Sequence, residues 1–204
     1  GYAPQLAGTA GDSDVHEVAV DADGEPVFVS TLFSCVARPD PRVSFRPVWK
    51  PAFVSRYAAE DRCHLNGLAM RDGHPAFATC VARSDANEGW REHRTDGGLL
   101  LDIATGEVAC AGLSMPHSPR WYRDRLWLVN AGTGEFGWVD LARGRFEPVA
   151  FCPGFLRGLA FVGDHAVVGL SLQRENRTFG GLALDQRLAD KGVSARCALQ
   201  VIDL

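Results

Sequence analysis

The sequence predicts an all-β protein, a β-propeller or part of one, in a single domain that spans residues 1–204. Two observations predict this fold: a hairpin pattern that recurs along the chain, and a second strand–turn–strand pattern that follows it. Helix-like periodicity is scarce in the rest of the sequence. About four blades are visible, and the last of them is incomplete.

The recurring hairpin has a polar residue, a short apolar strand, a tight turn with Asp or Gly, and a second apolar strand. Its copies begin at His16, Asn66, His117 and Arg157, and these steps of about 40 to 50 residues suit four-stranded propeller blades. We therefore expect inner hairpins with strands at 16–20 and 26–31, 66–70 and 75–81, 117–122 and 125–130, and 157–162 and 165–171. An outer strand pair follows each hairpin, as at 99–109 and 137–146, and residues 201–204 begin a copy that is cut short.

Two insertions interrupt the repeat, at 83–97 and 172–196, each between the second and third strands of its blade. The later insertion contains the one good helix candidate, 184–192, which Gly192 is placed to end. Equivalent loops of a propeller emerge on one face, and long loops in compact domains often carry function. Docking of a protein partner through these insertions is therefore one expectation.

The candidate site follows from the repeat, because the inner strand of every blade lines the central channel. The residues that open these strands, His16, Asn66, His117 and Arg157, should converge at one mouth of a narrow tunnel. His64 precedes Asn66 by two residues, which predicts that it lies on the same strand face. The same mouth is expected to receive four polar residues of the second insertion: Arg174, Glu175, Asn176 and Arg177.

Three functions are compatible with this site, and the sequence leaves them open. The first is a binding domain for a small polar or anionic ligand, or a peptide, with Arg157 as the anion-binding group. The second is a metal-dependent lyase or hydrolase in which His16, His64 and His117 hold a divalent cation such as zinc or calcium. In that enzyme Arg157 or Glu175 would position the substrate. The third is a protein-interaction scaffold, in which the insertions 83–97 and 172–196 dock another protein. The structural alternative to any site is that His16 and His117 only satisfy backbone groups of neighbouring blades.

Composition argues against several other classes. The formal net charge of −4 and the absence of a Lys/Arg run argue against nucleic acid as a partner. No apolar stretch approaches the roughly 20 residues that span a bilayer, so we expect no membrane partner. The six cysteines form no Cys-x-x-Cys pair, which favours buried free thiols in the reducing cytoplasm, although an even count leaves disulfides open. The G-x-G-x-x-G match at 132–137 lies between two strands, so we interpret it as a hairpin turn.

Seven runs, which together cover nearly the whole chain, resemble one bacterial family. They are residues 14–18, 33–37, 44–49, 61–68, 114–121, 153–159 and 174–179. The family consists of conserved hypothetical proteins, is described only as a domain of unknown function, and is thought to be propeller-like. The resemblance brings no activity and implies that full-length members are longer. At the level of architecture alone, the chain is also similar to propeller enzymes that hold a metal with channel histidines, such as amidating lyases and lactonases.

Overall fold

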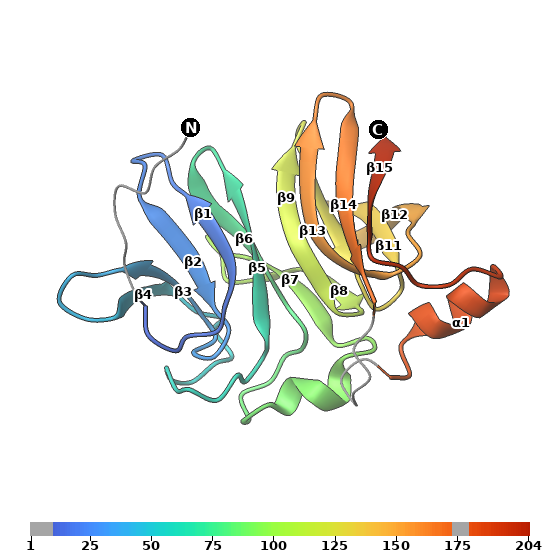
Figure 1. Ribbon diagram of the computed structural model, residues 1–204. Helices are drawn as coiled ribbons and strands as arrows, with labels where there is room; N and C mark the ends of the chain where they lie inside the picture. Colours follow the sequence, from blue (N-terminus) through green and yellow to red (C-terminus); the bar gives the residue numbers. More distant parts are fainter. Residues whose placement is uncertain (1–9, 173–179) are drawn as a thin grey trace.

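The computed structural model describes residues 10–172 and 180–204, and it folds into four antiparallel sheets (Figure 1). Three sheets have four strands and the fourth has three, which confirms a propeller-type fold with an incomplete last blade. Within each sheet the strands pair in sequence order, so each blade is a meander. The first two sheets are β1 (Val15–Val20), β2 (Pro26–Ser30), β3 (Cys35–Pro39) and β4 (Phe45–Trp49), then β5 (Leu65–Arg71), β6 (His74–Cys80), β7 (Gly98–Asp102) and β8 (Val108–Leu113). The last two are β9 (Pro116–Tyr122), β10 (Arg125–Asn130), β11 (Glu135–Asp140) and β12 (Arg145–Phe151), then β13 (Phe155–Val162), β14 (His165–Ser171) and β15 (Ala198–Asp203).

The four expected inner hairpins are present as β1–β2, β5–β6, β9–β10 and β13–β14. Two of them close through two-residue loops whose residues have positive φ: Asp72 and Gly73 (52° and 75°), and Arg123 and Asp124 (50° and 57°). Such left-handed turns match the twist of antiparallel strands and fix their register. Local turn chemistry is therefore one reason why the hairpins follow from the sequence.

The core lies between the blades. One buried cluster joins the first two sheets around Val29, Leu65 and Leu101, and a second joins the second and third sheets around Leu100, Leu126 and Leu128. A third cluster joins the last two sheets and includes Trp127 and Phe136. Neighbouring inner strands accordingly pack against one another in the order β1, β5, β9, β13. This packing brings the beginnings of the four inner strands together.

Both insertions leave their blades between the second and third strands. The first contains a short 3-10 helix, η1 (Gly89–His93), and the second contains α1 (Ala183–Asp190), which confirms the expected helix; Gly192 follows it with a φ of 61°. Arg94 of the first insertion donates from Nη2 to the Gly180 carbonyl of the second at 2.8 Å. The two insertions therefore meet on one side of the molecule, the lower side in Figure 1.

The six cysteines are free thiols, and all except Cys197 are buried. Burial raises the pKa of the Cys35 thiol to about 12 and that of Cys152 to about 11, so both stay protonated and unreactive at neutral pH. Among the helices of the described residues, none is long and apolar enough to cross a membrane.

Candidate functional site

A register irregularity interrupts each of the four inner hairpins at the predicted site position or directly after it. The pairing register shifts between Val15 and Glu17, between Leu65 and Gly67, and between Leu156 and Leu159, which leaves His16, Asn66 and Arg157 outside the regular ladder. In the third hairpin the shift lies directly after His117. Bulges re-aim side chains and are frequent beside active sites. Here an irregularity recurs near the start of every inner hairpin.

The four residues that open the inner strands do gather, as predicted. Asn66 Nδ2 lies 3.4 Å from His117 Nε2, across the boundary between the second and third blades. The His16 and His64 rings lie edge to face with centroids 5.0 Å apart. The positive charge of Arg157 acts on both His16 and His117. All four blades thus contribute a polar side chain to one place.

His117 and Asn66 form the buried part of the site, with exposed fractions of 3% and 2%. His117 Nδ1 lies 2.8 Å from the Met115 carbonyl, which accepts only from an N–H, so Nδ1 carries the proton and Nε2 is the acceptor. Thr79 Oγ1 donates to Asn66 Oδ1 at 2.8 Å, which orients the amide so that Nδ2 faces the His117 ring. Contacts within the protein therefore fix the orientation of both side chains.

His16 is held in a similar way. Its Nδ1 lies 2.8 Å from Thr31 Oγ1, and the Thr31 hydroxyl donates to the Leu65 carbonyl at 2.6 Å. Because the hydroxyl proton is used on that carbonyl, the His16 Nδ1–H is the donor to Thr31. This chain of contacts ties the first blade to the start of β5.

His64 reaches the site by a route that the sequence did not predict. It lies just before β5, with a φ of 51°, so the alternation of a strand does not place it, and the strand-face argument was wrong. His64 Nδ1 donates to Asp61 Oδ2 at 2.8 Å, and Trp90 Nε1 of the first insertion donates to the same oxygen at 2.9 Å. The His64 ring also packs on Trp90, with centroids 4.2 Å apart. An aspartate and an indole therefore position this imidazole.

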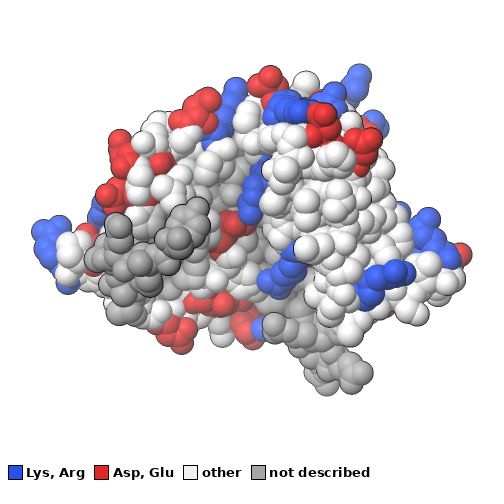
Figure 2. All heavy atoms as spheres, turned by 45° about the horizontal axis from the view of Figure 1, so that its top comes forward, with Lys and Arg blue, Asp and Glu red and all other residues white. Residues whose placement is uncertain are grey.

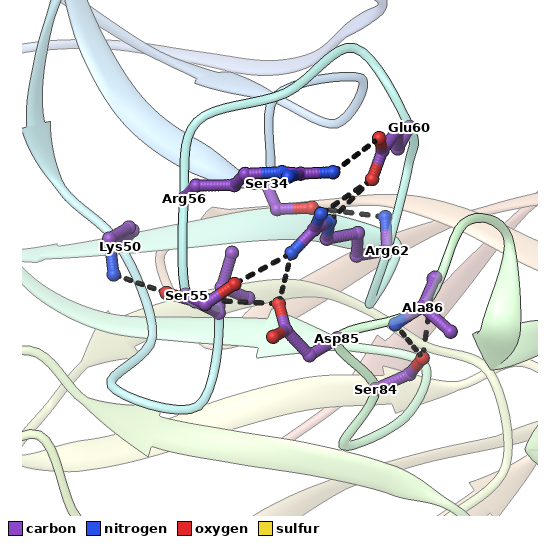
Figure 3. Close-up of polar contacts among 10 residues, drawn as sticks. Ser34, Lys50, Ser55, Arg56, Glu60, Arg62, Ser84, Asp85 and Ala86 are labelled. Atoms are coloured by element: carbon purple, nitrogen blue, oxygen red, sulfur yellow. Dashed lines mark hydrogen bonds and ion pairs between the residues drawn. The ribbon is translucent and has the colours of Figure 1, made fainter.

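The backbone that carries Asp61 and His64 is clamped by Arg62. Its guanidinium donates to Glu60 Oε2 at 2.7 Å, to Ser55 Oγ at 2.9 Å and to Asp85 Oδ1 at 2.5 Å (Figure 3). Hydrogen bonds from the Ser55 amide and hydroxyl, with the contact to Arg62, lower the pKa of Asp85 to about 2. Asp61 and His64 both have positive φ (42° and 51°), a conformation that is costly for residues other than glycine. The clamp holds this strained segment in place.

Arg157 is the exposed member of the site. Its guanidinium lies over the Phe155 ring at 5.8 Å, and Phe155 in turn contacts the edge of the His117 ring. The Arg157 carbonyl occupies the space that a side chain at Gly169 would need, because a Cβ there would lie 2.2 Å from it. Glycine at this position of β14 therefore permits the bulge that displays Arg157.

Electrostatics keep two of the imidazoles neutral. Burial, and then the charge of Arg157, hold the pKa of His117 well below its usual value. For His16, burial and the proximity of His64 lower the pKa, and Asp14 only partly opposes them. At neutral pH the site therefore combines one permanent cation, Arg157, with the neutral imidazoles of His16 and His117.

The axis is closed beneath the site, which corrects the expectation of a narrow tunnel. Arg120 of β9 forms two hydrogen bonds with the Glu17 carboxylate of β1, at 3.0 and 3.1 Å. It also donates to the Leu68 carbonyl of β5 at 3.4 Å and to the Leu159 carbonyl of β13 at 3.1 Å. One guanidinium thus joins β9 to the other three inner strands. We use the word cup for the polar side chains gathered at the start of these strands above Arg120, with the Arg120–Glu17 pair as its floor: His16, His64, Asn66, His117 and Arg157.

The expected metal ligands do not form a metal centre within residues 10–172 and 180–204, where no group of three His, Cys, Asp or Glu side chains could hold an ion. Each of the three histidines instead has its Nδ1 in a hydrogen bond with the protein.

The other predicted site residues, Arg174, Glu175, Asn176 and Arg177, lie outside the described residues. Figure 2 shows blue and red atoms interspersed on the upper face, without a large area of one sign.

Sequence reasoning missed several residues that support the site: Thr31, Asp61, Thr79, Trp90 and the Arg120–Glu17 pair. Thr31 directly follows β2, and Thr79 is the last residue but one of β6. Both therefore lie opposite the start of the first strand of their blade, so the hairpin register contained a signal for both. Asp61 and Trp90 are 29 residues apart, and no local pattern joins them.

A family model described as a domain of unknown function, DUF4915, matches residues 1–204. No curated protein matches the sequence. Among solved structures, the WD40 domain of Neurospora crassa Pan2 is similar with a TM-score of 0.50 and 13% identity, over 93% of this chain and 48% of that one. Kuenenia stuttgartiensis hydrazine synthase is similar with a TM-score of 0.50 and 13% identity, over 100% and 49%. The chain thus spans about half the length of these structures, and at this identity the likeness concerns the fold alone.

Proposed function

Because the chain belongs to the DUF4915 family, whose description names no activity, we propose a function from the geometry of the site: the domain binds a small anionic ligand in the cup formed by the four inner strands. The observation that carries this proposal is the bulge repeated at the head of every inner hairpin. Bulges that gather polar side chains at one point are typical of binding sites.

The charge of the cup supports an anion. Arg157 is a permanent cation with planar donors that suit carboxylate or phosphate. The neutral imidazoles of His16 and His117 add polar contacts without adding charge. The net charge of −4 over the whole chain argues against nucleic acid. The buried free thiols support a reducing, cytoplasmic location. No specific observation favours the metal-dependent enzyme or the scaffold over this binding function.

Binding can be tested by thermal unfolding with a panel of small carboxylates, phosphate and sulfate, followed by calorimetric titration of each anion that raises the melting temperature. We expect at least one anion to stabilise the protein, and Arg157→Gln to abolish the stabilisation. Arg143→Gln is the matched control, because Arg143 is an exposed arginine on the turn after β11, where it pairs with Asp140. Anions that stabilise both variants equally would contradict the proposal.

The anionic group can belong to a free small molecule or to the C-terminus of a peptide. Peptides with free and amidated C-termini distinguish the two sources. Binding of the free acid alone, lost in Arg157→Gln, would show that a peptide carboxylate occupies the cup. Binding of small acids without either peptide would assign the cup to a metabolite.

A further inference from the structure

We propose that the cup takes up a proton together with its anion, and that this proton goes to His16. The proposal rests on the proposed anion binding and adds its regulation, because the anion is then held more tightly in mild acid than at neutral pH. It concerns one ring nitrogen, His16 Nε2, and the charges that surround it.

His16 has a ring nitrogen that the protein does not use. Its Nδ1–H is donated to Thr31 Oγ1 at 2.8 Å, because the Thr31 hydroxyl proton is used on the Leu65 carbonyl. No hydrogen bond from residues 10–172 or 180–204 reaches Nε2 of this ring. The side chain is 14% exposed, so part of it remains accessible. Protonation at Nε2 therefore breaks no hydrogen bond among these residues.

His117 lacks this freedom. Asn66 Nδ2 lies 3.4 Å from its Nε2, and Thr79 holds the Asn66 amide in that orientation by donating to Oδ1 at 2.8 Å. A proton on His117 Nε2 would therefore point at the hydrogens of an amide nitrogen. His117 is also only 3% exposed, so its charged form would be withdrawn from water. We accordingly expect the additional proton on His16 rather than on His117.

The charges that act on His16 come from three other blades or segments. The His64 ring lies edge to face with centroids 5.0 Å apart, Arg157 belongs to β13, and Asp14 Oδ1 lies 3.6 Å from His16 Nδ1. Burial, then His64 and Arg157, hold the pKa of His16 below its usual value, and Asp14 only partly opposes them.

An anion beside Arg157 changes this balance. Its charge offsets the repulsion between Arg157 and a protonated His16, and it attracts the imidazolium directly. The proton therefore binds more tightly when the anion is present, and by reciprocity the anion binds more tightly when the proton is present. The direction of this coupling is the same whether His64 is neutral or charged.

The coupling can be measured by calorimetric titration at about pH 6.5 with sulfate and with acetate, which are both almost fully ionised there. Each titration is repeated in buffers of different ionisation enthalpy, because the difference gives the protons taken up per anion. We expect proton uptake, and sulfate affinity that rises about three- to ten-fold from about pH 7.5 to 5.5, within the limit of tenfold per pH unit for one proton. His16→Gln should lose the uptake and the pH dependence. His74→Gln, at an exposed histidine that begins β6, is the matched control and should keep both.

A ligand-free measurement separates this proposal from the proposed function. NMR titration of the histidine ring signals gives the pKa of His16, which should be higher in Arg157→Gln than in the wild type or in the control Arg143→Gln. Anion binding without proton uptake, or uptake that persists in His16→Gln, would overturn the proposal and leave anion binding intact. If His16 titrates as expected but no anion binds, the proposed function fails and the coupling fails with it.

Discussion

His117 shows how one side chain can be fixed by its surroundings on every side. The Met115 carbonyl accepts from Nδ1, Asn66 approaches Nε2, and Phe155 packs on the ring. Burial and the nearby Arg157 keep it uncharged. In the folded protein the His117 ring therefore stays neutral at a pH at which the same ring in the unfolded chain would already be protonated.

This resistance predicts a loss of stability in mild acid. Because the pKa values of His16 and His117 are lower in the folded than in the unfolded protein, the unfolded chain binds more protons below about pH 6.5. The free energy of unfolding should therefore fall as pH decreases from about 7 to 5. Urea unfolding of the wild type and of His117→Gln at several pH values measures the effect. The variant should lose less stability across this interval, and equal slopes would contradict the prediction.

The residues of the site were predictable where they repeat and unpredictable where they depend on contacts distant in sequence. His16, Asn66, His117 and Arg157 occupy equivalent positions of a hairpin, so their convergence followed from the repeat. His64 was predicted for the wrong reason, because it lies before β5 in a left-handed conformation. Asp61, which orients it, meets Trp90 only after an insertion folds back. Such contacts leave no periodic signal.

At the scale of elements, the segment between β4 and β5 does more than connect two blades. Arg62 joins it to the first insertion through Asp85, and its amide donates to Ser34 Oγ at 3.2 Å, between β2 and β3 (Figure 3). The blade limits were predictable from local turns and alternating strands. The function of this segment was not, because its sequence resembles an ordinary loop.

Arg62 and Arg56 offer a matched test of this clamp. Both pair with Glu60, but the Arg62 side chain is 6% exposed and that of Arg56 is 68% exposed. Removing Arg62 leaves Glu60 and Asp85 without their shared cation, whereas Arg56 makes an exposed pair that contributes little. Arg62→Ala should lower the urea midpoint more than Arg56→Ala and broaden the NMR signals of His64. Equal urea midpoints and unchanged His64 signals would show that residues 61–64 keep their conformation without the contacts of the Arg62 side chain.

At the scale of the whole molecule, the described chain forms an open array rather than a closed ring of blades. β13, β14 and β15 expose Val162, Leu199 and Val201, and β1 exposes Val18 and Val20, with exposed fractions between 61% and 74%. The inner faces of the same sheets are packed against their neighbours. The periodic hairpins predicted the blades, but they carry no information on how the axis is filled.

The axis is filled by Arg120, and this predicts a cost for its removal that an ordinary surface arginine would not have. Arg120→Met keeps the aliphatic stem but removes hydrogen bonds to Glu17 and to the Leu68 and Leu159 carbonyls. We expect a loss of about 2 to 3 kcal/mol in the free energy of unfolding, the range for hydrogen bonds of a charged group. Arg145→Met, at an exposed arginine on the edge strand β12 that pairs with Glu147, should cost about 0.5 kcal/mol or less. Adding Glu17→Gln to Arg120→Met should then cost little more, because the partners act as a pair. If urea unfolding finds the two arginine variants equally stable, the blades are held together by their apolar faces alone, and the polar floor of the cup contributes nothing to their arrangement.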